Sequence, residues 1–84
     1  MYIQHLQPNI IREDSYLTVI SERAGNLILK VLDVDGHMAK TMVEDVTEGL
    51  QQLVINLGDL ASGNYILNAF NGDTFIKAIR FSKQ

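Results

Sequence analysis

The 84-residue sequence has no cysteine, no tryptophan and a single proline. The absence of cysteine excludes disulfides, thiolate catalysis and cysteine-ligated zinc or iron–sulfur centres. No apolar run approaches the roughly 20 residues of a membrane span, and the first residues lack the basic and apolar regions of a signal peptide. These absences leave the compartment open, and we expect either a cytosolic protein or a piece of a longer exported chain.

The sequence also has little excess charge, with seven basic and ten acidic residues and a formal net charge of -3. This balance argues against electrostatic binding to nucleic acid or anionic lipid, which requires a basic face. A hydrophobic fraction of 46% is ordinary for a globular protein rather than a disordered one. The length allows one domain, so we expect residues 1–84 to share a single core.

Helical periodicity is missing, whereas signals for β-strands recur along the chain. Ile, Val and Thr together make up 19 of the 84 residues, and their branched side chains suit a pleated sheet. Short apolar runs alternate with turn residues at intervals of roughly 8–12 residues. The pattern predicts seven strands, over residues 2–6, 15–21, 26–33, 37–43, 51–57, 64–70 and 74–82.

The connections between these strands are predicted from glycine and acidic residues. Asp35-Gly36 indicates one tight turn, and residues 44–49 indicate a polar acidic connection. Asn71-Gly72-Asp73 is the strongest hairpin signal, for which we expect a type I′ turn with positive φ at both central positions. Seven short strands linked in this way fit an antiparallel two-layer β-sandwich of immunoglobulin-like size, with a closed barrel as the alternative.

Most apolar residues are interpreted as core. In the last predicted strand, Phe75, Ile79 and Phe81 share one face with Lys77, so we expect both phenylalanines to be buried. Other aromatic side chains have no predicted place in the core. They are Tyr2, Tyr16 and Phe70, the candidates for a carbohydrate-stacking surface.

Signals for catalysis and metal binding are weak. The two histidines, His5 and His37, occur in no nucleophile or zinc-binding motif, and we interpret them as exposed turn or edge residues. Asp33-Val34-Asp35-Gly36 lacks the register of a calcium loop, although a weak site built from Asp14, Asp33 and Asp35 stays open as an alternative. We therefore predict no catalytic residue, no metal and no cofactor.

Positive charge gathers at the end of the chain. Residues 77–84 contain Lys77, Arg80 and Lys83 and no acidic residue, whereas residues 44–48 contain three acidic residues and no basic one. A basic strand on an acidic domain can be a recognition edge. It can equally be an outer strand whose charges prevent edge-to-edge aggregation.

One segment goes beyond composition. Leu57, Leu60, Gly63 and Tyr65 form the pattern Leu-x-x-Leu-x-x-Gly-x-Tyr, which is followed by the Gly72 hairpin and the basic last strand. Upstream stand Pro8-Asn9 and an apolar strand that ends at the Gly36 turn. In this order the pieces resemble the C-terminal sorting domains of the type IX secretion system, although Ile10 stands where that family commonly has a second proline.

The resemblance implies an immunoglobulin-like β-sandwich without catalytic activity, placed at the C-terminus of a larger secreted protein. Its expected partners are the upstream cargo domain, the outer-membrane secretion machinery and its sortase-like protease, and its expected location is the cell surface. The hypothesised contacts with the machinery are Lys77, Arg80 and Lys83, whereas the remaining motif residues are expected to be structural. We expect a monomer or a weak dimer formed by edge-strand pairing.

Two alternatives are an adhesive or carbohydrate-binding module of a surface enzyme and an inert spacer domain. The first requires exposed aromatic side chains on a sheet face or loop, and the chain has no tryptophan to supply them. The second requires that loss of the domain affects neither export nor binding.

Overall fold

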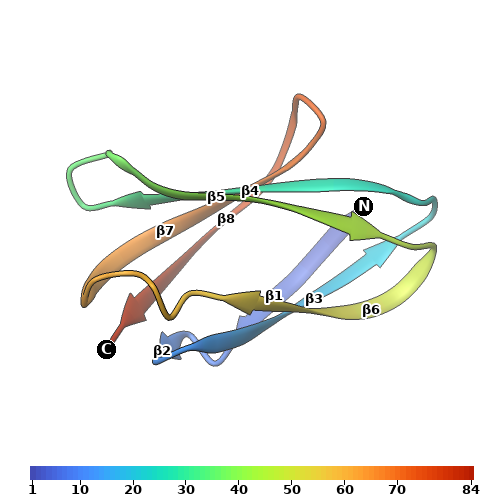
Figure 1. The fold of residues 1–84 in the computed structure, drawn as a ribbon. Coiled ribbons are helices and arrows are strands. Elements are labelled where there is room, and N and C mark those ends of the chain that lie inside the picture. Colours follow the sequence, from blue (N-terminus) through green and yellow to red (C-terminus); the bar gives the residue numbers. More distant parts are fainter.

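The computed structural model describes residues 1–84, and most of them belong to β-strands, with no helix (Figure 1). There are eight strands. Their bounds are β1 Tyr2–Gln7, β2 Ile10–Ile11, β3 Asp14–Ser21, β4 Gly25–Asp33, β5 Met38–Val46, β6 Gly49–Asn56, β7 Gly63–Asn71 and β8 Thr74–Lys83. The seven predicted strands are confirmed, and β2 is an eighth that the sequence analysis missed.

The strands form two sheets stacked as two layers (Figure 1). The three-stranded sheet has the order β1-β3-β6, and the five-stranded sheet has the order β2-β8-β7-β4-β5. Because the two sheets are separate, the fold is a β-sandwich rather than the closed barrel that was the alternative.

The prediction of an entirely antiparallel seven-stranded sandwich is wrong in one respect. The chain leaves the three-stranded sheet after β1, and Ile10 and Ile11 then pair in parallel with Ser82 and Lys83 of β8. A strand of two residues has too little sequence to show an alternating pattern, and its partner lies at the far end of the chain. Local sequence therefore gave no signal for β2.

Alternation along the strands produces the core. Residues such as Leu17 and Val19 of β3 point inward, where they meet Leu29 of β4 and Leu67 of β7 in one cluster of 16 buried apolar residues. All four of these side chains are inaccessible to solvent. Residues of both sheets contribute to this one cluster.

Three local predictions need correction. The acidic connection is shorter than predicted, because β5 continues through Glu44 to the buried Val46. The hairpin is present, but only Gly72 has positive φ (59°), which matches a type II′ turn instead of type I′. Phe75 is 54% exposed, because a bulge between Ala69 and Phe70 shifts the β7–β8 register and leaves Phe75 on the outer face. The buried position of Phe81 is confirmed.

Two inward-pointing lysines span the two open sides of the sandwich. On one side the Lys40 Nζ atom of β5 donates to the carbonyl oxygen of Asn56 and to Asp59 Oδ1, both at 2.8 Å. On the other side the Lys77 Nζ atom of β8 lies 3.3 Å and 3.2 Å from the carbonyl oxygens of Ile3 and Gln4 in β1. Charged side chains placed in this way satisfy unpaired backbone groups and discourage edge-to-edge pairing.

Candidate functional site

The segment that carries the family resemblance links β6 to β7 and closes one end of the sandwich. The Leu57 amide donates to the carbonyl oxygen of Glu13 at 2.7 Å, and the Leu60 amide donates to the Leu57 carbonyl oxygen at 3.1 Å. Both leucine side chains belong to the buried core. These backbone bonds hold the loop against the start of β3, so that its two leucines cover the end of the hydrophobic layer.

Gly63 and Tyr65 complete this closure at the start of β7. Gly63 has a φ of 155°, which side chains rarely permit, and it turns the chain into the strand. The buried Tyr65 ring stacks on Phe81 of β8 with centroids 5.4 Å apart, and its hydroxyl donates to the Ala61 carbonyl oxygen at 2.6 Å. The Tyr65 hydroxyl therefore ties the start of β7 to the loop that precedes it.

Pro8 and Asn9 join the beginning of the chain to its end. The Pro8 carbonyl oxygen accepts a hydrogen bond from Ser15 Oγ at 2.6 Å, and the Asn9 carbonyl oxygen accepts one from the Ser82 amide at 2.9 Å. These two contacts place the segment between β3 of one sheet and β8 of the other. Pro8-Asn9 thus positions β2 beside the last strand.

The Gly36 turn is held by the side chain of Asp33. Its Oδ1 atom accepts hydrogen bonds from the backbone amides of Asp35 and His37, both at 2.9 Å. Gly36 has a φ of 82° and donates its amide to the Asp33 carbonyl oxygen. Asp33 therefore orders this turn, in the way that aspartate side chains commonly do.

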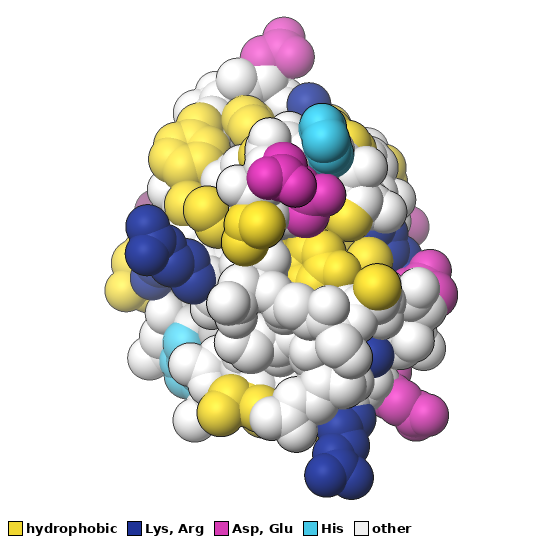
Figure 2. All heavy atoms as spheres, turned by 90° about the vertical axis from the view of Figure 1, so that its left-hand side faces the viewer, with side chains coloured by type: hydrophobic (Ala, Val, Ile, Leu, Met, Phe, Trp, Pro, Cys, Tyr) yellow, Lys and Arg dark blue, Asp and Glu magenta, His cyan; other side chains and the backbone are white.

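The acidic residues and histidines considered for metal binding and catalysis are grouped differently from the sequence-based alternative. Ligand atoms of Asp33, Asp35 and His37 lie within 4.8 Å of one another, and Figure 2 shows acidic and histidine side chains together on this end of the molecule. Asp14 pairs with Asn56 in the three-stranded sheet, whereas Asp33 belongs to β4 of the five-stranded sheet. The three residues of the calcium alternative are therefore not brought together. Neither His5 nor His37 hydrogen-bonds a hydroxyl group; His5 contacts Gln7, and His37 lies 3.7 Å from Asp33.

The three basic residues of β8 lie in three different environments. Lys77 donates to carbonyl oxygens of β1, as described above. Lys83 is buried, and its Nζ atom donates to the Gln84 carbonyl oxygen at 3.0 Å. Arg80 is exposed on the outer face, and its guanidinium forms no hydrogen bond or ion pair within the chain. Of the three, Arg80 alone presents an uncommitted charge to a partner.

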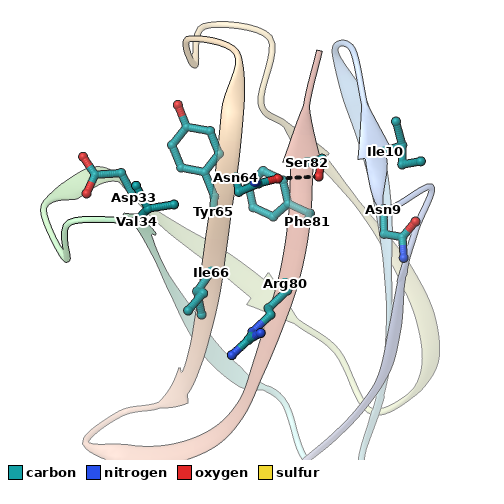
Figure 3. Close-up of a pocket in the computed structure, with 10 residues that line it drawn as sticks. All are labelled: Asn9, Ile10, Asp33, Val34, Asn64, Tyr65, Ile66, Arg80, Phe81 and Ser82. Carbon is teal, nitrogen blue, oxygen red and sulfur yellow. Dashed lines mark hydrogen bonds between the residues drawn. The ribbon is translucent and has the colours of Figure 1, made fainter.

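Arg80 lies in a groove of about 560 Å³ on the outer side of the five-stranded sheet. In Figure 3, Val34 of the Gly36 turn lies on one side and Ile10 of β2 on the other, with Ile66 and Arg80 between them. The Ser82 hydroxyl forms a 2.7 Å hydrogen bond with Asn64 in the same groove. The groove therefore has a mixed lining, in which half of the residues are apolar and the Arg80 guanidinium and the Asp33 carboxylate are the charged groups.

Sequence reasoning missed the apolar part of this groove. Ile10 lies outside the predicted strands and Ile66 looks like an ordinary strand residue. Only Val34 carries a signal, because it is an apolar residue between two aspartates of a turn. Val34 is 77% exposed, the highest value among the exposed large apolar side chains.

One carboxyl group near this end has a perturbed pKa. A hydrogen bond from Lys40 to Asp59, together with the charge of Lys40, lowers the pKa of Asp59 below its ordinary value of 3.8. The Lys40–Asp59 pair thus favours the ionised carboxylate at neutral pH and joins β5 to the loop after β6.

The fold and these contacts define an all-β sandwich whose first and last segments meet at one end, beside a groove with a free guanidinium. No family model, no curated protein and no solved structure matches the chain. The structure contains no helix with the length and apolar character needed to cross a membrane.

Proposed function

We propose that this chain is a non-catalytic, immunoglobulin-like sorting domain that directs a cargo protein through the outer membrane by the type IX secretion system. The observation that supports this most is the closure of the sandwich by the motif residues. Leu57 and Leu60 are buried there, Gly63 turns the chain, and Tyr65 bonds the Ala61 carbonyl oxygen. A motif that resembles a family signature thus has a shared structural role in this fold.

The strand order supports the immunoglobulin-like part of the proposal. With β2 set aside, β1-β3-β6 corresponds to the order A-B-E, and β8-β7-β4 corresponds to G-F-C. Tyr65 stands near the start of β7, the counterpart of strand F, and its hydroxyl bonds the backbone four residues upstream. This is the arrangement of a tyrosine corner in such domains.

The resemblance suggests Lys77, Arg80 and Lys83 as contacts for the secretion machinery. Arg80 is the strongest of the three, because its guanidinium is free and lies in a groove of which half the lining residues are apolar. Lys77 and Lys83 donate hydrogen bonds within the chain, so their first effect is on the fold. We therefore propose Arg80 as the principal basic contact.

Export of a reporter tests this function directly. Residues 1–84 are fused behind a signal peptide and a periplasmic reporter enzyme in a bacterium that has the type IX system, with the same reporter lacking the domain as control. We expect the reporter at the cell surface only when the domain is present. A folded fusion that stays in the periplasm, while a family domain exports the same reporter, rejects the proposal.

A further inference from the structure

The outer face of the three-stranded sheet carries an unusual amount of exposed apolar side chain. Five large apolar residues on this face are between 42% and 71% exposed. They are Tyr2, Tyr16, Ile20, Leu50 and Val54. Single exposed apolar residues are common on soluble proteins, but a contiguous group marks a surface that meets another apolar surface.

Strand register arranges these residues in two rows. Tyr2, Ile20 and Leu50 lie directly opposite one another across β1, β3 and β6, and form the first row. Tyr16 and Val54 face each other in the second row, four residues away along β3. Side chains paired in this way lie about 5 Å apart. The first row is therefore apolar on all three strands, whereas the second is apolar on β3 and β6 and has Gln7 on β1.

A polar row separates the two apolar strips. It contains His5, Thr18 and Gln52, which are paired across the same three strands. The Gln52 side chain donates to the Thr18 hydroxyl at 3.4 Å, so part of this row is internally bonded. Thr18 lies midway between the apolar strips on the central strand, and the face therefore has a nearly symmetric apolar–polar–apolar pattern.

We propose that this face, defined by Tyr2, Tyr16, Ile20, Leu50 and Val54, is a homodimer interface in which two copies pack sheet against sheet. A two-fold axis through the neighbourhood of Thr18 places the first apolar row of one copy on the second row of the other. An interface of this kind must be complementary to itself, and the apolar–polar–apolar pattern meets that requirement.

Charge favours a second copy as the occupant. The chain has a net charge of -3, so most of its surfaces would bring like charges together on self-association. The three rows of this face contain no Asp, Glu, Lys or Arg. By contrast, the outer face of the five-stranded sheet includes Lys30 and Arg80, which self-pairing would bring close to their own copies.

The available area sets the strength of the dimer. The two half-exposed tyrosines and three aliphatic side chains offer roughly 400 Å² of apolar surface per copy. With the polar row, a pair of copies buries about 1,000 Å², which is the lower end for a specific interface. We therefore expect a reversible dimer with a Kd of about 10 μM to 1 mM.

This dimer differs from one formed by edge-strand pairing. An edge dimer would use the unpaired backbone of an outer strand of one sheet, such as β5, whose Lys40 side chain already bridges to Asn56 and Asp59. The sheet-face dimer instead uses side chains of β1, β3 and β6 and leaves the backbone of β5 free. Substitutions on the two surfaces separate these possibilities.

Sedimentation equilibrium of the 84-residue protein across a wide concentration range tests the proposal. We expect reversible dimerisation for the wild type and a loss of at least about tenfold in affinity for Ile20→Glu. The matched control is Val43→Glu, an apolar position on the other sheet that is 63% exposed against 42% for Ile20, and this variant should dimerise like the wild type. A folded Thr41→Pro protein should also keep the dimer, because β5 takes no part in the sheet-face interface.

A second measurement covers the case in which Ile20→Glu does not fold. Wild-type amide resonances are followed by NMR during dilution, and shifts confined to β1, β3 and β6 support the interface. A wild type that stays monomeric at about 1 mM overturns the proposal, as does a dimer that survives Ile20→Glu or is lost in a folded Thr41→Pro protein. Dilution shifts centred on β5, or a monomer that binds a soluble polysaccharide through Tyr2 and Tyr16, overturn it equally.

Discussion

The two outer faces of this sandwich are built by the same strand alternation but differ in chemistry. On the three-stranded sheet, apolar rows flank a neutral polar row, and no charged side chain interrupts them. On the five-stranded sheet, Lys30 lies over the Phe70 ring, and Arg80 lies unpaired in a groove. The three uncharged rows of the first face, which are bounded on β3 by Asp14, are suited to a copy of themselves, whereas a face with a free guanidinium is suited to a partner that carries an anion.

The two faces can differ in this way because their exposed side chains contribute little to the stability of the fold. The inward side chains of both sheets form one continuous buried cluster, and the outer apolar residues lie outside it. The outer faces can therefore change in sequence with little effect on the fold. The predictions that follow test this separation, beginning with the largest effect.

The largest effect is expected within β3, where inner and outer residues alternate. Leu17 is fully buried, so Leu17→Ala should lower the free energy of unfolding by about 3 kcal/mol. Ile20→Ala, three residues away on the outer face, should lower it by less than about 1 kcal/mol. Urea denaturation measures both, and similar losses for the two variants would contradict the separation of core and outer face.

A smaller effect is expected within β8, where Lys77 and Arg80 have different partners. Lys77→Met removes the two contacts with β1 carbonyl oxygens and should lower the free energy of unfolding by about 1.5 kcal/mol. Arg80→Met should change it by less than about 0.5 kcal/mol, because Arg80 has no partner within the chain. Equal destabilisation by both substitutions would show that Arg80 has a role in the fold.

Two tyrosines allow a comparison at the level of a single hydroxyl group. Tyr65→Phe removes the bond to the Ala61 carbonyl oxygen and should lower the free energy of unfolding by about 1 kcal/mol. Tyr16→Phe on the outer face is the control, and it should be neutral because the Tyr16 hydroxyl has no partner within the chain. If Tyr65→Phe is also neutral, the hydroxyl contributes nothing to closing the sandwich.

The smallest effect concerns the side of the sandwich that Lys40 spans. Its hydrogen bond lowers the pKa of Asp59, so the pair stabilises the fold above the ordinary pKa of 3.8, and this contribution is lost as the pH falls through the lowered value. In Lys40→Met the pKa of Asp59 should rise toward 3.8, as followed by NMR titration of the carboxyl carbon. An unchanged pKa would remove Lys40 as its cause.

The sequence was sufficient to predict seven strands and the two tight turns, because each leaves a local pattern. Alternating apolar residues mark the strands, and Asp35-Gly36 and Gly72 mark the turns. Each of these features is determined by residues close together in the chain.

The features that could not be predicted depend on contacts between distant residues. The two-residue β2 exists because Ile10 and Ile11 meet the end of β8, and the exposure of Phe75 follows from a bulge opposite Phe70. The three basic residues of β8 looked equivalent in the sequence. Their separation into two internal donors and one free guanidinium appears only when β1 and the chain terminus are in place.

The central claim is that the two outer faces serve different partners, with Arg80 on the face that the secretion machinery contacts. The most direct test compares surface export of one reporter fused to the wild-type domain, to Arg80→Ala and to Ile20→Glu, after urea denaturation has shown that all three fold. We expect Arg80→Ala to reduce export by at least about fivefold and Ile20→Glu to export like the wild type. Normal export with Arg80→Ala, or loss of export with Ile20→Glu alone, would contradict this assignment.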